Sequence, residues 1–224
     1  RKVAVKANVI KYKIPMFYCN GVGSQTEIVF DGTSLVFDKN ANLCGRMASF
    51  TEDLQSFILQ DDGTIKGSVI EQADKIPDID LNPDSLNEVL NIDHIYEALV
   101  MGIRDYFSKM GFSKAIIGSS GGIDSAVTLA LACKALGREN VHAVLMPSPF
   151  STSHSVSDAE QLGKALLNRH DIIPIKNIYD SFLEELKPFF KDLPFSLAEE
   201  NIQSRIRGNL LMAMANKFGY ILLN

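Results

Sequence analysis

The feature that most constrains the fold is a regular alternation of short apolar runs and amphipathic segments from about residue 92 to the last residue. Apolar residues at three- and four-residue spacing first predict a helix over 92–110, with Asn91 as its N-cap and Gly111 just beyond its end. The apolar runs that follow are predicted strands: "KAIIG", "VHAVLM", "DIIPI" and "YILL". The segments between them predict helices at 123–136, 155–168, 179–190 and 197–217. Alternation of this kind predicts an α/β fold on a doubly wound, mostly parallel sheet.

The first 70 residues predict β structure instead. "IPMFYCN" is a predicted strand, "NAN" at 40–42 a turn, and "FTEDLQSFIL" an extended run. The apolar runs "EIVF" and "TSLVFD" are joined by Asp31-Gly32, a pair that predicts a β-hairpin. Residues 72–91 are acidic, contain two prolines and lack periodicity, which predicts a linker. We therefore expect three parts, at 1–71, 72–91 and 92–224.

Composition narrows the class of protein. The hydrophobic fraction of 46% supports an ordinary core, and the net charge of −5 argues against a general nucleic-acid binder. No apolar stretch reaches the length of a membrane span. Cys19, Cys44 and Cys133 form no C-x-x-C pair, which favours reduced thiols in a cytoplasmic protein, and the scattered histidines predict no zinc site. Because the chain begins without methionine and ends abruptly, we expect it to be a fragment of a longer protein.

The segment "GSSGGIDS", residues 118–125, lies where the predicted strand "KAIIG" ends and the helix over 123–136 begins. Ligands of doubly wound sheets bind at the carboxyl ends of strands, and the free N–H groups of a helix start bind anions. Glycines at 121 and 122 let the backbone come close to a ligand, and three serines add hydroxyl donors. The segment lacks the lysine of G-x-x-x-x-G-K-[ST] and the glycine spacing of the dinucleotide fingerprint. It therefore predicts an anion site of another kind.

Asp124 decides what kind of anion site this is. A carboxylate at a helix start is favourable by itself, but beside a polyphosphate it is repulsive unless a cation lies between them. Mg²⁺ binds through one or two carboxylates together with substrate phosphates. We therefore predict a site for Mg²⁺-pyrophosphate with Asp124 as a metal ligand; the alternative is a capped helix start that is merely rich in turn residues.

The stretch "SGGIDS" resembles the pyrophosphate loop of the N-type ATP pyrophosphatases, which include NAD, GMP and asparagine synthetases and tRNA-thiolating enzymes. These enzymes split ATP between its α and β phosphates and adenylate a substrate. The resemblance implies an adenine nucleotide alpha hydrolase-like fold, with ATP and Mg²⁺ as cofactors and Met146 and Pro147 shaping the adenine pocket. The implied ATP contacts are Gly118, Ser119, Ser120, Gly121, Gly122, Ile123, Asp124, Ser125 and Met146.

Three longer stretches resemble the glutamine-dependent NAD synthetases. Residues 144–166 and 196–224 are similar to segments of the synthetase domain, and residues 14–38 resemble the end of an α/β/β/α nitrilase-like glutaminase domain. The resemblance implies ATP-dependent amidation of deamido-NAD to NAD through an adenylated intermediate, with ammonia supplied from glutamine. It implies no catalytic residue in this chain, since Cys19 and Cys44 do not match the glutaminase nucleophile.

The predicted helix over 197–217 has two distinct faces. Its expected buried stripe consists of Ile202, Ile206, Leu210 and Ala213, whereas Asn201, Arg205 and Asn209 share another face. By periodicity alone that polar face is solvated. The resemblance implies instead that deamido-NAD is bound by Asn201, Arg205 and Arg207. His154 is expected to be exposed near the ATP pocket, with a ligand contact as the alternative.

The resemblance also implies partners: deamido-NAD, glutamine or ammonia, and further copies of the chain in a homo-oligomer, with neither nucleic acid nor membrane. Two other functions stay open from the sequence. One is an ATP-pyrophosphatase amidotransferase of the GMP- or asparagine-synthetase type. The other is a non-catalytic module that binds ATP with the same loop.

Overall fold

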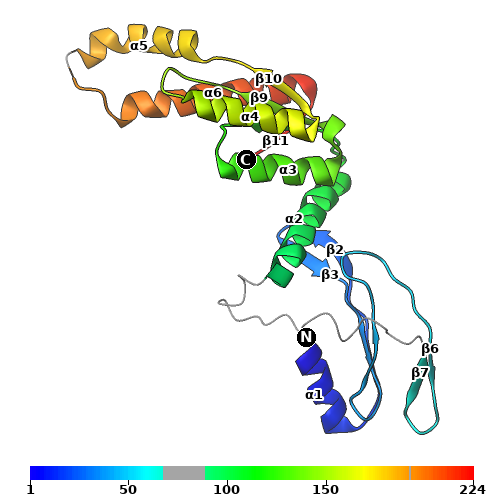
Figure 1. The fold of residues 1–224 in the computed structure, drawn as a ribbon. Helices are drawn as coiled ribbons and strands as arrows, with labels where there is room; N and C mark the ends of the chain where they lie inside the picture. Colours follow the sequence, from blue (N-terminus) through cyan, green and yellow to red (C-terminus); the bar gives the residue numbers. More distant parts are fainter. Residues whose placement is uncertain (68–88, 192) are drawn as a thin grey trace. The chain divides into compact units, whose positions relative to one another are not determined.

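The computed structural model describes residues 1–67, 89–191 and 193–224. They form two compact units, Arg1–Tyr106 and Phe107–Asn224 (Figure 1). We call these unit 1 and unit 2. The two units divide inside helix α2 (Val89–Met110). The linker predicted at 72–91 lies largely outside the described residues, and the predicted domain boundaries stay a prediction.

Unit 1 begins with helix α1 (Lys2–Tyr12), which is followed by short antiparallel strands. One sheet has the order β1-β4-β5, from Met16–Tyr18, Leu35–Phe37 and Leu43–Arg46. Two further pairs join β2 (Val22–Gln25) to β3 (Ile28–Asp31) and β6 (Phe57–Leu59) to β7 (Ile65–Gly67). A core cluster of buried residues lies between α1 and the three-stranded sheet: Val5, Val9, Leu35, Phe37 and Ala41.

Two predictions for unit 1 are wrong. Residues 2–12 form a helix and not β structure, because Val5 and Val9, one helical turn apart, both pack into the core beside β1 and β4. No hairpin crosses Asp31-Gly32, since β3 pairs with β2 while β4 pairs with β1 and β5. Gly32 instead turns the chain between two sheets at φ +69°, and the Asp31 carboxylate accepts a hydrogen bond from Asn20 Nδ2 at 3.0 Å.

Of two other predictions for unit 1, one is confirmed and one holds over only part of its range. The turn at 40–42 is confirmed between β4 and β5, where Asp38 Oδ1 accepts hydrogen bonds from the backbone N–H groups of Asn40 and Asn42, each at 2.9 Å. The extended run predicted over 50–59 forms a strand only at Phe57–Leu59.

Unit 2 is built on one parallel sheet with the order β10-β9-β8-β11. The strands are β8 (Ala115–Gly118), β9 (Val141–Leu145), β10 (Arg169–Ile172) and β11 (Ile221–Leu223). The helices are α3 (Ile123–Leu136), α4 (Ser153–Leu166), α5 (Lys176–Phe190) and α6 (Leu197–Phe218), and a short 3-10 turn, Arg138–Asn140, precedes β9. The predicted α/β fold on a doubly wound parallel sheet is therefore confirmed.

Several element boundaries differ from the predictions. Helix α2 begins at Val89, so Asn91 lies inside the helix and is not its N-cap. Helix α4 begins two residues early, because Thr152 Oγ1 accepts a hydrogen bond from the N–H of Ser155 and so caps the helix. Strand β10 begins two residues before the predicted "DIIPI" and ends at Ile172, short of Pro174, which has no N–H for the ladder.

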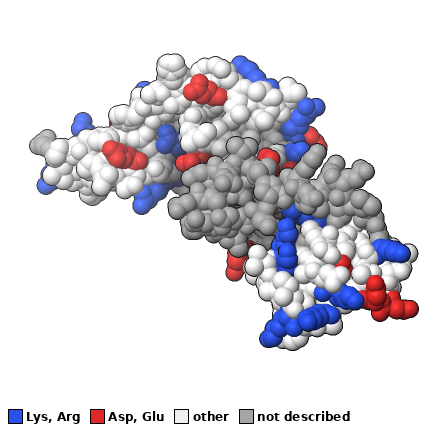
Figure 2. All heavy atoms as spheres, turned by 60° about the horizontal axis from the view of Figure 1, so that its bottom comes forward, with Lys and Arg blue, Asp and Glu red and all other residues white. Residues whose placement is uncertain are grey.

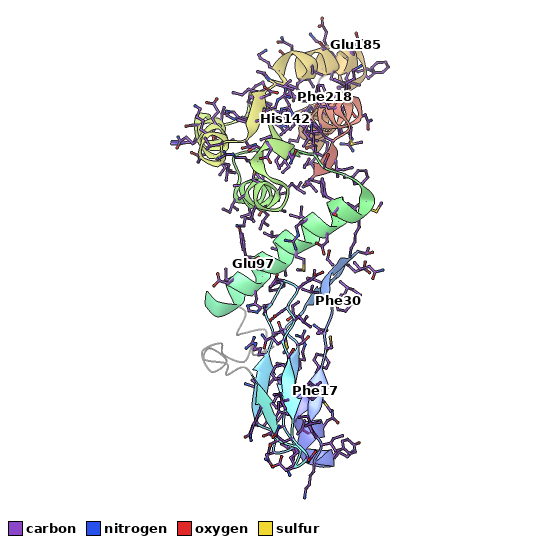
Figure 3. The ribbon with its side chains drawn as sticks, turned by 90° about the vertical axis from the view of Figure 1, so that its right-hand side faces the viewer. Phe17, Phe30, Glu97, His142, Glu185 and Phe218 are labelled. Carbon is purple, nitrogen blue, oxygen red and sulfur yellow. The ribbon has the colours of Figure 1, made fainter. Side chains whose placement is uncertain are left out.

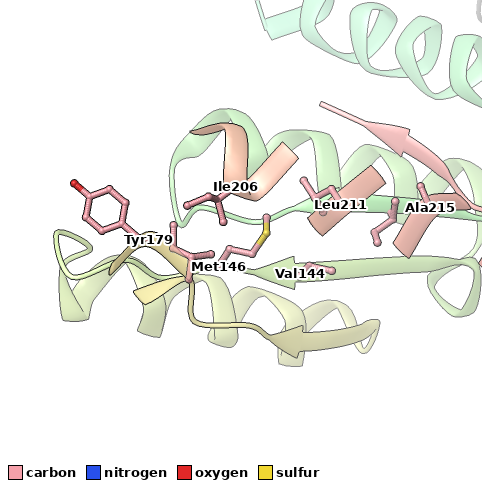
Figure 4. Packing of buried hydrophobic residues seen from close by; sticks show 8 residues of the cluster. Val144, Met146, Tyr179, Ile206, Leu211 and Ala215 are labelled. Atoms are coloured by element: carbon pink, nitrogen blue, oxygen red, sulfur yellow. The ribbon is translucent and has the colours of Figure 1, made fainter. Parts of the chain in front are cut away.

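Both faces of the parallel sheet are covered. Ile116 and Val144 pack with residues of α5 and α6, in the cluster that Figure 4 shows. Their sequence neighbours Ile117 and Ala143 point to the other face and pack with residues of α3 and α4. Because β9 and β11 lie on opposite sides of β8, the chain reverses its winding at β8. A doubly wound sheet has a crevice at the carboxyl ends of its strands at such a point.

His142 on β9 is a buried polar group in unit 2. Its Nε2 lies 2.8 Å from Asp171 Oδ2, and its ring is edge-on to Tyr220, just after the end of α6 near Phe218 (Figure 3). Burial lowers the pKa of His142, and the charge of Arg169 lowers it further, against the opposite effect of Asp171. The imidazole is therefore neutral near pH 7.

The surface of the described residues carries both signs of charge. On the face that Figure 2 shows, Lys and Arg side chains are interspersed with Asp and Glu. In the part of the chain that the structure describes, no helix combines the length and apolar character needed to cross a bilayer.

Candidate functional site

A cavity of about 400 Å³ opens at the carboxyl edge of the parallel sheet in unit 2. Its walls come from the ends of β8 and β9, the loop before α4, the first turns of α4, two residues of α6 and Asn224 after β11. The lining residues are Gly118, Ser119, Ser120, Leu145, Met146, Pro147, Phe150, Ser151, Thr152, Ser155, Val156, Ala159, Arg207, Leu211 and Asn224. The cavity therefore lies at the switch point of the sheet, where a ligand is expected.

The loop after β8 is held in a tight turn by its own serines. Ser125 Oγ donates to the carbonyl oxygen of Gly122 at 2.9 Å and lies 3.2 Å from Ser120 Oγ. The N–H of Gly122 donates in turn to Ser120 Oγ at 3.2 Å. Gly122 is the N-cap of α3 and has no side chain to cap it, so the first N–H groups of the helix have no side-chain cap. This arrangement supplies N–H donors for an anion.

Gly121 lets this turn approach α4 closely. Its φ is +84°, and a Cβ at this position would lie 2.2 Å from the carbonyl oxygen of Ser155 in the first turn of α4. Any side chain at 121 would therefore have to displace backbone. The close approach brings the starts of α3 and α4 together beside the cavity.

The part of the cavity wall around Met146 is mostly apolar and contains one cation. Met146 packs with Ile206 and Leu211 (Figure 4), and Arg207 Nε donates to the carbonyl oxygen of Met146 at 3.0 Å. Arg207 is the one charged residue among those that line the cavity. Burial lowers the pKa of its guanidinium. The cavity thus combines an apolar wall with hydroxyl groups and a partly buried positive charge.

Asp124 is exposed in the first turn of α3. Within residues 1–67, 89–191 and 193–224, no three His, Cys, Asp or Glu side chains come together as a metal site. Among these residues, Asp124 is the carboxylate of the loop at 118–125 that could hold a metal. This donor set fits Mg²⁺, which binds to few carboxylates when phosphate oxygens are available.

The structure separates the predicted site residues into three groups. Gly118, Ser119, Ser120, Met146 and Arg207 line the cavity, while Gly121 to Ser125 form the adjoining turn and helix start. Asn201 and Arg205 are exposed on α6 and do not line the cavity; Arg205 Nη1 donates to the carbonyl oxygen of Asn201 at 3.3 Å. His154 is exposed, as predicted.

The predicted buried stripe of α6 is partly wrong. Ile206 is buried, and Ile202 and Leu210 are half-buried, but Ala213 is exposed. The helix instead buries Leu211 and Ala215 against the sheet. This phase places Arg207, together with Leu211, on the side that faces the cavity.

Sequence reasoning assigned no role to four further residues that line the cavity. They are Phe150, Ser151 and Thr152 in the loop before α4 and Ser155 in its first turn, and the hydroxyl oxygens of Thr152 and Ser155 lie 2.8 Å apart. The available signal was a Ser/Thr-rich stretch directly after a predicted strand, at the sheet edge where ligands bind.

Comparisons of the sequence with protein families and with curated proteins both point to NAD synthases. Residues 95–224 match the family described as NAD synthase. The chain is 42% identical over 226 residues to a glutamine-dependent NAD(+) synthetase of Synechocystis sp., a match covering 100% of this chain and 38% of that protein. For the enzyme of the same name from Thermotoga maritima, the identity is 36% over 241 residues, covering 100% of this chain and 42% of that protein.

A solved structure is also similar. A glutamine-dependent NAD+ synthetase from Acinetobacter baumannii, in complex with adenosine diphosphate, matches with a TM-score of 0.87 and 36% identity. The match covers 99% of this chain and 40% of that chain. The chain thus spans well under half the length of the curated relatives it matches.

Proposed function

The chain belongs to the NAD synthase family, and from this premise we propose that it carries the ATP site of a glutamine-dependent NAD(+) synthetase. The proposed activity is that of a ligase that forms a carbon–nitrogen bond. It amidates deamido-NAD to NAD through an adenylated intermediate, with ammonia derived from glutamine. The observation that carries the proposal is the cavity at the switch point, which begins at the Gly118–Ser120 end of the "GSSGGIDS" loop.

In the proposed complex, ATP spans the cavity from the loop to the apolar wall. The N–H groups of the turn and of the start of α3 bind the polyphosphate, where the helix dipole favours negative charge. The adenine ring lies against Met146 and Pro147, which also line the cavity. The named complex of the Acinetobacter baumannii enzyme with adenosine diphosphate supports a nucleotide at this family's site.

Asp124 would hold Mg²⁺ together with phosphate oxygens, and the metal would neutralise charge on the leaving pyrophosphate. The chain's own contribution to this step would be electrostatic, from the backbone donors at the start of α3 and the carboxylate of Asp124 in its first turn. No protein nucleophile is needed, because the carboxylate of the substrate attacks the α-phosphorus.

Asn201 and Arg205 are proposed to bind deamido-NAD. Both are exposed on α6 outside the cavity, which leaves them accessible to a second, larger substrate. A guanidinium suits the phosphates and carboxylate of a dinucleotide because of its paired donors. We also propose that the protein forms a homo-oligomer and is located in the cytoplasm, as expected for a glutamine-dependent NAD(+) synthetase.

The experiment that tests this function is Asp124→Asn in the full-length protein, with pyrophosphate release measured in the presence of deamido-NAD. We expect turnover to fall on the order of 100-fold, since loss of metal charge at a leaving group costs several kcal/mol. Asp158→Asn, which removes an exposed carboxylate of α4 outside the cavity, is the matched control and should leave turnover intact. Unchanged turnover for Asp124→Asn would refute the metal-ligand role.

The choice of substrate is tested separately on the unmodified protein. Deamido-NAD, XMP and aspartate are each supplied with ATP, and AMP formation is measured. AMP formed only with deamido-NAD supports NAD synthesis, whereas AMP formed with XMP or aspartate would identify another amidotransferase of this group. ATP binding without AMP formation on any substrate would indicate a non-catalytic module.

A further inference from the structure

Arg207 is a cation without an anionic partner inside the cavity of unit 2. Among the described residues its guanidinium makes one hydrogen bond, from Nε to the carbonyl oxygen of Met146, and no ion pair. The other side chains that line the cavity are apolar or neutral, so none of these side chains compensates its charge. A partly buried, unpaired charge is costly, and proteins commonly retain one where a ligand supplies the opposite charge.

The position of Arg207 is set by the packing of α6. Leu211, one turn later in the helix, lies directly beside the end of β8, where a Cβ on Gly118 would be 3.1 Å from Leu211 Cδ1. Arg207 itself is fixed to Met146 at the end of the neighbouring strand β9. Its guanidinium is therefore held at the ends of β8 and β9, beside the start of the loop at 118–125.

This position corresponds to one part of an adenine nucleotide. If the β and γ phosphates lie on the turn and the start of α3, and adenine lies against Met146 and Pro147, the α-phosphate lies between them. The Nε of Arg207 is occupied, but its two terminal nitrogens keep donors in the planar geometry that suits two phosphate oxygens. The inference rests on the proposed ATP site.

We propose that Arg207 binds the non-bridging oxygens of the α-phosphate and stabilises their charge during adenylation. In that step an oxygen of the substrate carboxylate forms a bond to the α-phosphorus. The bond from this phosphorus to the bridging oxygen of pyrophosphate breaks, and pyrophosphate leaves with the electron pair. No proton moves, so a fixed cation at the α-phosphate assists without acid–base chemistry. Arg207 is thereby assigned to ATP and not to deamido-NAD.

The test compares AMP with adenosine, which differ by this phosphate, as ligands of the full-length protein in isothermal titration calorimetry. We expect AMP to bind the unmodified protein more tightly than adenosine does. In Arg207→Gln, AMP should bind tenfold to a hundredfold more weakly, about 1.4–2.8 kcal/mol at 1.4 kcal/mol per factor of ten, whereas adenosine binding should not change. Arg207→Lys keeps a charge without the planar fork, so the difference between AMP and adenosine should shrink and not disappear.

The other outcomes are distinct. Equal weakening of AMP and adenosine would mean that Arg207 only holds Met146 in place, which would overturn the proposal. Unchanged AMP binding with a raised KM for deamido-NAD would assign the cation to the substrate carboxylate and also overturn it. An unmodified protein that binds neither ligand would refute the ATP site itself. Lys217→Gln, which removes an exposed cation of the same helix outside the cavity lining, is the control and should preserve the difference between AMP and adenosine.

Discussion

Replacement of Gly121 by alanine should disrupt the loop through two separate costs. The first is backbone strain, since φ is +84° and a non-glycine residue at positive φ costs about 1–2 kcal/mol. The second is steric, because the new Cβ would lie 2.2 Å from the Ser155 carbonyl oxygen and 2.8 Å from its Cα. Relief requires the first turn of α4 to move by roughly an ångström, and such overpacking costs about 1–3 kcal/mol. The sum is about 2–5 kcal/mol.

Thermal unfolding and ATP binding of the full-length protein measure this prediction together. Gly121→Ala should lower the melting temperature and weaken ATP binding, because the displaced backbone belongs to the cavity wall. Gly102→Ala in α2 is the matched control: nothing lies within 4 Å of its Cβ, so the change should stabilise the helix by about 0.5–1 kcal/mol. If Gly121→Ala melted and bound ATP like the unmodified protein, the argument from close approach to α4 would be wrong.

Two further predictions concern the stability of unit 2. Ser196 caps α6: its Oγ accepts a hydrogen bond from the N–H of Ala198, and the Glu199 carboxylate accepts one from the N–H of Ser196. Ser196→Ala should therefore lower the free energy of unfolding, measured in denaturant, by about 0.5–2 kcal/mol, and Ser196→Thr should lower it much less. Equal stability of all three proteins would contradict the cap. The pKa of His142 is lowered in the folded protein, whereas in the unfolded chain the imidazole takes up its proton near pH 6.5. The contribution of His142 to the free energy of unfolding is therefore present above about pH 6.5 and is lost as the pH falls toward the folded pKa. His142→Asn should flatten the stability profile below about pH 6.5, and an unaltered profile would exclude His142 as its source.

Local sequence patterns were sufficient for the core of unit 2. The bounds predicted for α3, 123–136, are those observed, because a strand, a Gly/Ser loop and a helix with glycine beyond its end are all signalled by neighbouring residues. The parallel arrangement also follows from the order of the elements, since parallel strands need a crossover between them. The position of the loop at the carboxyl edge of the sheet is a consequence of the same order.

Contacts between distant residues decided the rest. The segment over 2–12 is rich in valine and isoleucine, and it becomes a helix only because Val5 and Val9 fit together against the β1-β4-β5 sheet. Asp31-Gly32 has the composition of a hairpin turn, but the partners of the flanking strands lie elsewhere in the chain. Pairing of strands depends on backbone hydrogen bonds and burial that the turn residues alone do not specify.

The sequence alone determined the class of fold, the prediction of an anion site at the loop 118–125 and the choice of Asn201, Arg205 and Arg207 as candidate ligand contacts on α6. Only the tertiary structure decided which of them reaches the cavity. Helix α6 carries apolar residues on several sides, so its period does not select one buried face. The sheet makes the selection by accepting Leu211 and Ala215, and this rotation brings Arg207 to Met146 while Arg205 stays exposed. Two residues along a helix amount to about 200° of rotation, which only packing can assign.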